Sequence, residues 1–286
     1  MALRDLSPLD RWTVLYAVFA CLVFLWRWPA SAAVGSHFPV VHAGLAGLAL
    51  MAPRLRRHGL LGEAWADFYP LILTLALYTE IGLLARAVGL SHDLTVQAWE
   101  AALFGGQPSR DWIRAWPSPW LSWPLHLGYL SYYVILAGSP LGLWLLGRRA
   151  GAREAGCLIM VAFYLCYAVF LLFPVAGPRY LFPQAANSAT AIPIATLTQK
   201  LLNSGGAWGT AFPSSHVAAA LVASLTAWRF SRLLGAVLVP LSVLLAIGTV
   251  YGQFHYLLDA LAGATLAAVV LAFAARISGT PPLHNV

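Results

Sequence analysis

The sequence predicts an all-α protein, a polytopic transmembrane helix bundle of about eight spans. Three observations lead to this fold class. Hydrophobic residues make up 60% of the chain and charged residues only 9%, whereas about a quarter of a soluble domain is charged. Several apolar runs approach the roughly 20 residues that a helix needs to cross a bilayer. Twelve Trp and eleven Tyr suit a protein with two membrane interfaces, where amphipathic aromatic rings settle.

The apolar runs between charges, prolines and glycines locate the spans. They fall at residues 12–28, 34–52, 68–90, 120–147, 154–173, 214–230, 233–251 and 255–276. The run at 214–230 is short and begins with polar residues. Two long connections remain. The first, 91–119, is rich in Trp and is expected to lie along the membrane surface, and the second is 174–213.

The distribution of basic residues predicts an orientation. If the N-terminus lies inside the cell, the inside segments hold 11 of the 17 Lys and Arg residues: Arg4, Arg11, Arg54, Arg56, Arg57, Arg148, Arg149, Arg153, Arg229, Arg232 and Arg276. Cytoplasmic loops are normally enriched in these residues. We therefore expect both termini in the cytoplasm and the long connections on the extracytoplasmic face.

The expected organisation has three parts. Residues 1–67 form two N-terminal transmembrane helices. Residues 68–276 form a membrane core with the interfacial segment 91–119 and the outer loop 174–213. Residues 277–286 form a cytoplasmic tail.

Composition also argues against several functions. The net charge of +7 comes from basic residues placed singly or in short clusters, without the basic stripe of a nucleic-acid-binding protein. The three cysteines lie inside apolar runs and have neither metal spacing nor a disulfide pattern, so they are expected to be small core residues. His37, His42 and His126 have no accompanying carboxylates, so no metal site and no cofactor is expected.

Three polar segments are predicted to meet at the outer surface. Residues 174–180 follow the fifth span, residues 212–216 open the sixth, and residues 251–259 join the seventh to the eighth. Because the spans alternate in direction, these segments fall on one face of the membrane.

These segments carry the candidate functional residues. His255 and Asp259 are four apart, so on a helix the carboxylate can reach and orient the imidazole. His216 lies just inside a helix start, where free N–H groups suit an anion. Arg179 offers a forked, permanently charged phosphate ligand. Tyr180, Ser214 and Ser215 complete the candidate phosphate-binding residues. Taken singly, each feature also fits a helix cap, a chance spacing or a side chain that reaches the headgroups. Together they predict a catalytic phosphate site.

At these residues the chain resembles the type 2 phosphatidic-acid phosphatase superfamily. The second motif of that family, Pro-Ser-Gly-His, is matched by residues 213–216 with Ser215 in place of Gly, and the third, His-x-x-x-Asp, by His255 and Asp259. The resemblance implies a six-helix catalytic core that acts on a membrane lipid phosphate without a metal ion. It implies that His255 attacks phosphorus and forms a phosphohistidine, that Asp259 orients it, and that His216 protonates the leaving oxygen. Water or an alcohol would then accept the phosphoryl group.

Two departures from the family pattern affect the expected reaction. Leu172 stands where the first motif has Lys, and Thr249 stands where the third motif usually has Arg. The only lysine, Lys200, lies in the outer connection. With fewer cations, the chain is similar to the inositol-phosphorylceramide-synthase branch, whose members transfer a phospho-headgroup from one lipid to another alcohol. Such a headgroup transferase is the alternative to a lipid phosphatase.

Two non-enzymatic alternatives also remain. Glu80 and Arg86 lie in or near the third span, where a charged residue is a functional candidate. They would suit a transporter or channel, although the sequence has no inverted repeat of the kind many transporters show. A family member that has lost its activity and serves as a scaffold is the other alternative.

Overall fold

The computed structural model describes residues 6–279. Over that range the chain is helical, and its only extended pairing is an isolated bridge between Val175 and Thr210. In chain order the elements are α1 (Pro8–Trp26), the 3₁₀ helix η2 (Ala30–Val34), α2 (His37–Leu55), α3 (Gly59–Val88), α4 (Asp93–Phe104), α5 (Pro108–Ala115), α6 (Pro119–Leu130), α7 (Tyr132–Leu145), α8 (Arg149–Leu172), α9 (Pro178–Leu181), α10 (Pro193–Gly205), α11 (Ser215–Phe230), α12 (Arg232–Tyr251), α13 (Leu257–Ala272) and α14 (Ala274–Ser278). The predicted all-α fold is confirmed. Arg4 and the tail residues 280–286 lie outside the described residues.

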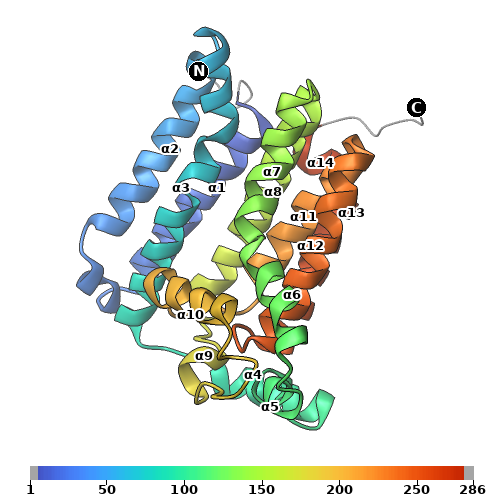
Figure 1. The fold of residues 1–286 in the computed structure, drawn as a ribbon. Coiled ribbons are helices and arrows are strands. Elements are labelled where there is room, and N and C mark those ends of the chain that lie inside the picture. Colours follow the sequence, from blue (N-terminus) through green and yellow to red (C-terminus); the bar gives the residue numbers. More distant parts are fainter. Residues whose placement is uncertain (1–5, 280–286) are drawn as a thin grey trace.

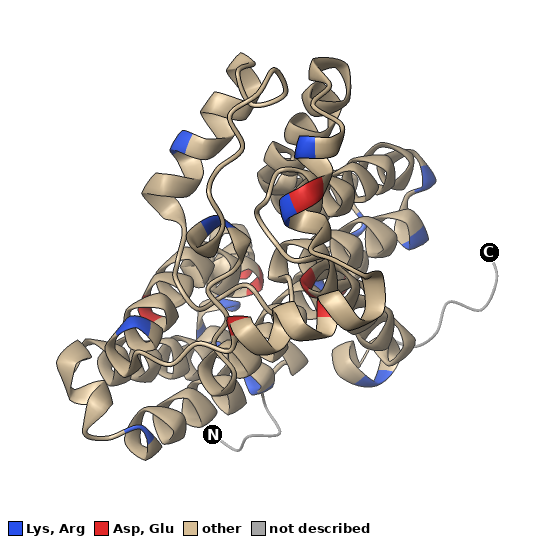
Figure 2. Ribbon diagram, turned by 90° about the horizontal axis from the view of Figure 1, so that it is seen from below, with Lys and Arg blue, Asp and Glu red and all other residues tan. Residues whose placement is uncertain are grey.

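The long helices run side by side along one axis (Figure 1), and each of the eight predicted spans overlaps helices of this bundle. Five of these helices, α1, α2, α3, α8 and α12, are long and apolar enough to cross a membrane. The apolar helices α7 and α13 are shorter, and α11 has 16 residues. Few charged residues interrupt the bundle (Figure 2). The chain is therefore built as an integral membrane protein.

Two helices differ from the predicted spans. The third span was expected at 68–90, whereas α3 extends over Gly59–Val88. At about 1.5 Å per residue, such a helix is longer than the roughly 30 Å hydrocarbon core of a bilayer. The fourth span was expected to be continuous, but it is divided at Ser131 into α6 and α7. The Ser131 hydroxyl donates to the Gly128 carbonyl at 2.6 Å, a local bond of the kind that competes with regular helix.

Helix α8 forms the centre of the bundle and packs against α1, α3, α7, α11 and α13. It is apolar around most of its circumference, as expected for a helix with neighbours on every side. Its partner α11 contributes a buried series of small residues, Ala218, Ala219, Ala220, Ala223 and Ala227. Small residues let helices approach closely, which in a membrane is a main source of packing energy.

The two ends of the bundle differ in character. The first and last described residues lie at the upper end in Figure 1. Gly279 is there so close to Pro8 that a Cβ atom at position 279 would lie 3.4 Å from the proline ring. The ion pairs Arg56–Asp67, Arg153–Asp67 and Arg229–Glu154 belong to helix segments near this end. The lower end is covered by α4, α5, α9 and α10 (Figure 1). The two long connections therefore fold into short helices that lie across one end of the bundle.

We propose that the end covered by α4, α5, α9 and α10 faces away from the cytoplasm, because the basic loops lie at the other end. The test is single-cysteine labelling in a background that lacks Cys21, Cys157 and Cys166. Lys200→Cys on α10 and Arg148→Cys between α7 and α8 replace exposed residues at opposite ends. In intact cells a membrane-impermeant thiol reagent should label the first variant and reach the second only after permeabilisation. The reverse pattern would contradict the proposed orientation.

Candidate functional site

Three irregular segments meet at the lower end of the bundle and are joined by their backbones. The Ala211 N–H donates to the Val175 carbonyl at 2.9 Å, and the Val175 N–H donates to the Gly209 carbonyl at 3.3 Å. The Ser214 N–H donates to the Asp259 carbonyl at 2.9 Å. The segments around residues 175, 211 and 259, predicted to meet at one face, therefore do come together.

His255 lies in the loop between α12 and α13 and is only 5% exposed. Its Nδ1 is 3.1 Å from the Ala211 carbonyl oxygen and 3.3 Å from Oδ2 of Asp259. Because a carbonyl oxygen can only accept, Nδ1 must carry the proton and Nε2 keeps its lone pair. Burial lowers the pKa of His255 to about 4, so the neutral ring is favoured. The ring is thus held in the tautomer of a nucleophile.

Asp259 is fully buried in the first turn of α13. Its Oδ2 accepts the Tyr256 N–H at 2.9 Å, which caps the helix and fixes the carboxylate beside His255. Gly263 lets α13 approach this closely, because a Cβ at that position would lie 2.4 Å from the Ser214 carbonyl oxygen. The predicted pairing of His255 with Asp259 is therefore formed, with the Ala211 carbonyl as a further acceptor.

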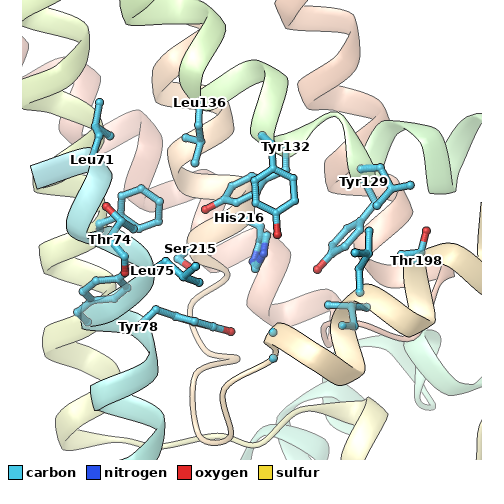
Figure 3. Close-up of a pocket in the computed structure, with 18 residues that line it drawn as sticks. Leu71, Thr74, Leu75, Tyr78, Tyr129, Tyr132, Leu136, Thr198, Ser215 and His216 are labelled. Atoms are coloured by element: carbon cyan, nitrogen blue, oxygen red, sulfur yellow. The ribbon is translucent and has the colours of Figure 1, made fainter. Parts of the chain in front are cut away.

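His216 lies in the first turn of α11, which Ser214 caps by accepting the Val217 N–H at 3.4 Å. Its ring is stacked with Tyr129 at 5.5 Å between centroids and lies 4.4 Å from the Tyr132 ring. Figure 3 shows this arrangement. The break at Ser131 brings both tyrosines to His216 from two different helices. The centroids of the His216 and His255 rings are 5.6 Å apart, so the two imidazoles face the same small volume.

Arg179 lies on α9 and reaches towards α10. Its Nη2 donates to the Leu202 carbonyl at 3.0 Å and to Oδ1 of Asn203 at 3.2 Å. A guanidinium has five N–H donors, so donors remain for an anion. Gly206 leaves room for the guanidinium, because a Cβ there would lie 2.5 Å from Nη1.

Two cavities adjoin His216. A small cavity of about 30 Å³ is bounded by Arg179, His216 and His255, together with Tyr180 and Phe254. A larger cavity of about 320 Å³ lies between α3, α7, α10 and α11 and is lined mainly by leucine and tyrosine side chains (Figure 3). His216 borders both cavities. A phosphate in the first cavity and an apolar group in the second would therefore meet at this histidine.

The remaining predicted residues occupy different positions around these cavities. Ser215 lines the larger cavity and Tyr180 the smaller one. Ser214 is fully buried as the α11 cap and lines neither cavity. Lys200 is exposed on α10. Among the residues that line the two cavities, Arg179 alone carries a cation.

The two residues that depart from the motif pattern line neither of the two cavities. Leu172 is 45% exposed and its carbonyl accepts from Nη2 of Arg27 at 3.2 Å. Thr249 is buried, and its carbonyl accepts the N–H groups of Phe254 and His255 at 2.9 and 3.0 Å. Thr249 thus supports the His255 loop without adding a positive charge.

Sequence reasoning missed four residues near the site. Tyr129 and Tyr132 contact His216, and their place in the Tyr-rich run 129–133 was the only available signal. Asp93 and Glu100 are buried acids on α4, in a segment expected to lie along the membrane surface. Glu100 Oε1 accepts the Leu258 N–H at 3.1 Å, and burial raises the pKa of its carboxyl to about 7. Acidic residues in a segment along the membrane surface are expected to be exposed, so the sequence gave no sign that Asp93 and Glu100 are buried.

Comparison with known proteins gives one match. The model of the PAP2 superfamily matches residues 94–273, which is more than half of the chain and extends from α4 to the end of α13. No curated protein and no solved structure gives a significant match. Within residues 6–279, no group of three or more His, Cys, Asp or Glu side chains is arranged to hold a metal ion.

Burial of His255 is expected to make stability depend on pH. Its pKa is about 4 in the folded protein and 6.5 when exposed, so the unfolded state binds more protons between these values. The stability gained by burying the neutral ring is complete above about pH 6.5 and is lost as the pH falls towards 4, by at most about 1.4 kcal/mol per pH unit. The melting temperature of the purified protein should therefore fall over this window, and less steeply in His255→Gln.

Thermal melts of the two proteins at matched pH values check this prediction. Other groups, such as Glu100, titrate in both proteins, so the difference between the curves reports on His255. Parallel curves would contradict it.

Proposed function

We propose that this chain, which belongs to the PAP2 superfamily, cleaves the phosphate ester of a membrane lipid through a phosphohistidine intermediate. Family membership supports a phosphatase-type phosphoryl-transfer function. The observation that carries the proposal is the geometry around the small cavity: two histidine rings with centroids 5.6 Å apart and an arginine on one wall.

In the proposed reaction the Nε2 lone pair of His255 attacks phosphorus, and the bond between phosphorus and the ester oxygen breaks. His216, which takes up a proton when the phosphate anion binds beside it, gives that proton to the leaving oxygen. The carboxylate of Asp259 stabilises the positive charge that His255 acquires, and Arg179 stabilises the charge on the phosphoryl oxygens. His216, now neutral, takes a proton from water, which attacks the phosphohistidine and releases phosphate. The proposed reaction needs no metal ion, because Arg179 supplies the cation and His255 the nucleophile.

The larger cavity supports a lipid as the substrate. This cavity is the larger of the two beside His216, and it adjoins a third cavity of about 500 Å³. Four residues line both the larger and the third cavity: Leu71, Thr74, Tyr133 and Leu136. The cavities follow α3 and α7 along the direction of the bundle. Apolar walls that continue from His216 towards the middle of the membrane suit a hydrocarbon chain better than a soluble metabolite.

A second candidate is transfer of a phospho-headgroup to an alcohol of another lipid, as in the inositol-phosphorylceramide-synthase branch. Two observations favour it. Arg179 is the single cation lining the cavities, and a phosphodiester carries less charge than a phosphomonoester. The larger cavity also offers space beside His216 for an acceptor. In this reaction the alcohol replaces water in the second step.

Removal of either histidine should abolish turnover. For a lipid phosphate we expect His255→Ala to lose about 10⁴-fold or more in kcat, because the nucleophile is gone. His216→Ala should lose about 10²- to 10⁴-fold, which is the usual contribution of a general acid. With an aryl phosphate, whose leaving group needs no proton, His216→Ala should recover much of its activity and His255→Ala none.

The measurement is phosphate release and formation of new lipid species by purified protein, with and without an alcohol acceptor, in the presence of EDTA. Lys200→Ala is the matched control, since Lys200 is exposed on α10. Full activity in either histidine variant would rule out the mechanism. Solute flux through liposomes without any turnover would favour a transporter instead.

Filling the larger cavity should lower activity on long-chain substrates and leave activity on short-chain substrates unchanged. Leu136→Trp places a bulkier side chain where both apolar cavities meet. We expect kcat/KM for a long-chain lipid phosphate to fall about tenfold or more, and that for a short-chain soluble phosphate to stay near wild type. Val134→Trp on the same helix is the control, because Val134 is 59% exposed and lines neither cavity. An equal loss for both substrates would contradict the assignment of the cavity.

A further inference from the structure

We propose that Asp93, at the start of α4, is a positioning residue that holds the Arg179 segment and the His255 segment in their relative places. The proposal rests on the proposed function for its kinetic consequences, but the hydrogen-bonded connection that it describes can be measured without turnover.

Asp93 fixes the segment that carries Arg179. It is 3% exposed, and its Oδ2 accepts the Ala176 N–H at 2.7 Å while its Oδ1 accepts the Gly177 N–H at 2.9 Å. Gly177 has a φ of 96°, a conformation that residues with a Cβ rarely adopt. Pro178 follows directly and has a restricted φ. The carboxylate thus anchors a stiff turn two residues before Arg179, and it thereby directs the guanidinium towards the small cavity.

The same carboxylate fixes the segment that carries His255. The Tyr256 hydroxyl donates to Oδ1 of Asp93 at 3.0 Å and accepts from Nε2 of Gln97, one turn further along α4, at 2.9 Å. Tyr256 is fully buried, and its N–H donates to Oδ2 of Asp259 at 2.9 Å. A single side chain therefore connects the phosphate-binding arginine to the pair formed by His255 and Asp259.

The connection requires a carboxylate. Asp93 accepts from Ala176, Gly177, Tyr256 and the Ser91 hydroxyl, and these four donors are divided between its two oxygens. An asparagine has the same shape but only one acceptor oxygen, so its NH₂ group would face N–H or O–H donors. Asp93 lines neither cavity, so it acts through other residues rather than on the substrate.

The effect on catalysis follows from preorganisation. A displacement of about 1 Å of a catalytic group can cost about 100-fold in rate. We expect Asp93→Asn to lower kcat/KM by about 10- to 100-fold, because both Arg179 and His255 lose their relative placement. Tyr256→Phe, which removes one hydroxyl, should give a smaller loss. Asp111→Asn is the control, because Asp111 is a half-exposed acid on α5 that pairs with Arg110.

A double-mutant cycle separates positioning from general stability. If Asp93 acts by placing Arg179, Asp93→Asn should cost much less in an Arg179→Ala background than in wild type. Equal costs in the two backgrounds would overturn the proposed role for Arg179. If Asp93→Asn does not fold, the same cycle with Tyr256→Phe and Arg179→Ala provides the test, with the same criterion.

Amide hydrogen exchange tests the connection without turnover. Peptides that cover residues 174–180 and 252–258 should exchange faster in Asp93→Asn than in wild type, while Asp111→Asn leaves both unchanged. Unchanged exchange in Asp93→Asn would overturn the proposal whatever the enzyme does. Faster exchange in Asp93→Asn, together with a wild-type protein that hydrolyses no lipid phosphate, would support the positioning role and contradict the proposed function alone.

Discussion

The backbone of Ala211 is the junction on which the site depends. Its N–H donates to the Val175 carbonyl, and its carbonyl accepts from Nδ1 of His255. It therefore links the segment before Arg179 with the loop of His255, five residues before His216. Buried backbone N–H and C=O groups need hydrogen-bond partners within the protein. Here that requirement holds three irregular segments together, and the proposed reaction would use the arrangement that results.

The packing of the bundle makes this junction possible. Helix α11 packs against α8 and carries a buried series of alanines, and Gly263 lets α13 lie against the start of α11. The two histidines belong to segments at the start of α11 and before α13, so the spacing of these helices sets the spacing of the two rings. The short helices α4 and α10 then cover the same end. Helix α4 supplies buried carboxylates beneath the site, and α10 accepts hydrogen bonds from Arg179. Both helices belong to the two long connections, for which the sequence predicted only segments at the membrane surface.

The sequence predicted the architecture well and the contacts of the site only in part. Hydrophobic runs of helical length have few alternatives to a membrane span, so each predicted span overlaps a helix, and five of the helices are long and apolar enough to cross a membrane. The break at Ser131 and the early start of α3 were not predicted. The pairing of His255 with Asp259 could be predicted because an i, i+4 spacing is local. The contacts of Tyr129 and Tyr132 with His216, and of Asp93 with Ala176, join residues more than 80 positions apart. Hydrophobic periodicity in the sequence does not predict such contacts, because they depend on how the helices pack.

The two positions that carry cations in the motif pattern add no charge to this site. Leu172 lies at the end of α8 with a half-exposed side chain, Thr249 is buried, and neither lines the two cavities beside His216. In the proposed reaction a single arginine holds the phosphoryl oxygens, so its placement matters more than it would beside two other cations. Arg179 is accordingly constrained from two directions: by α10, through the Leu202 carbonyl and Asn203, and by α4, through the turn that Asp93 anchors. A site with less positive charge thus depends more on the rigidity of its surroundings.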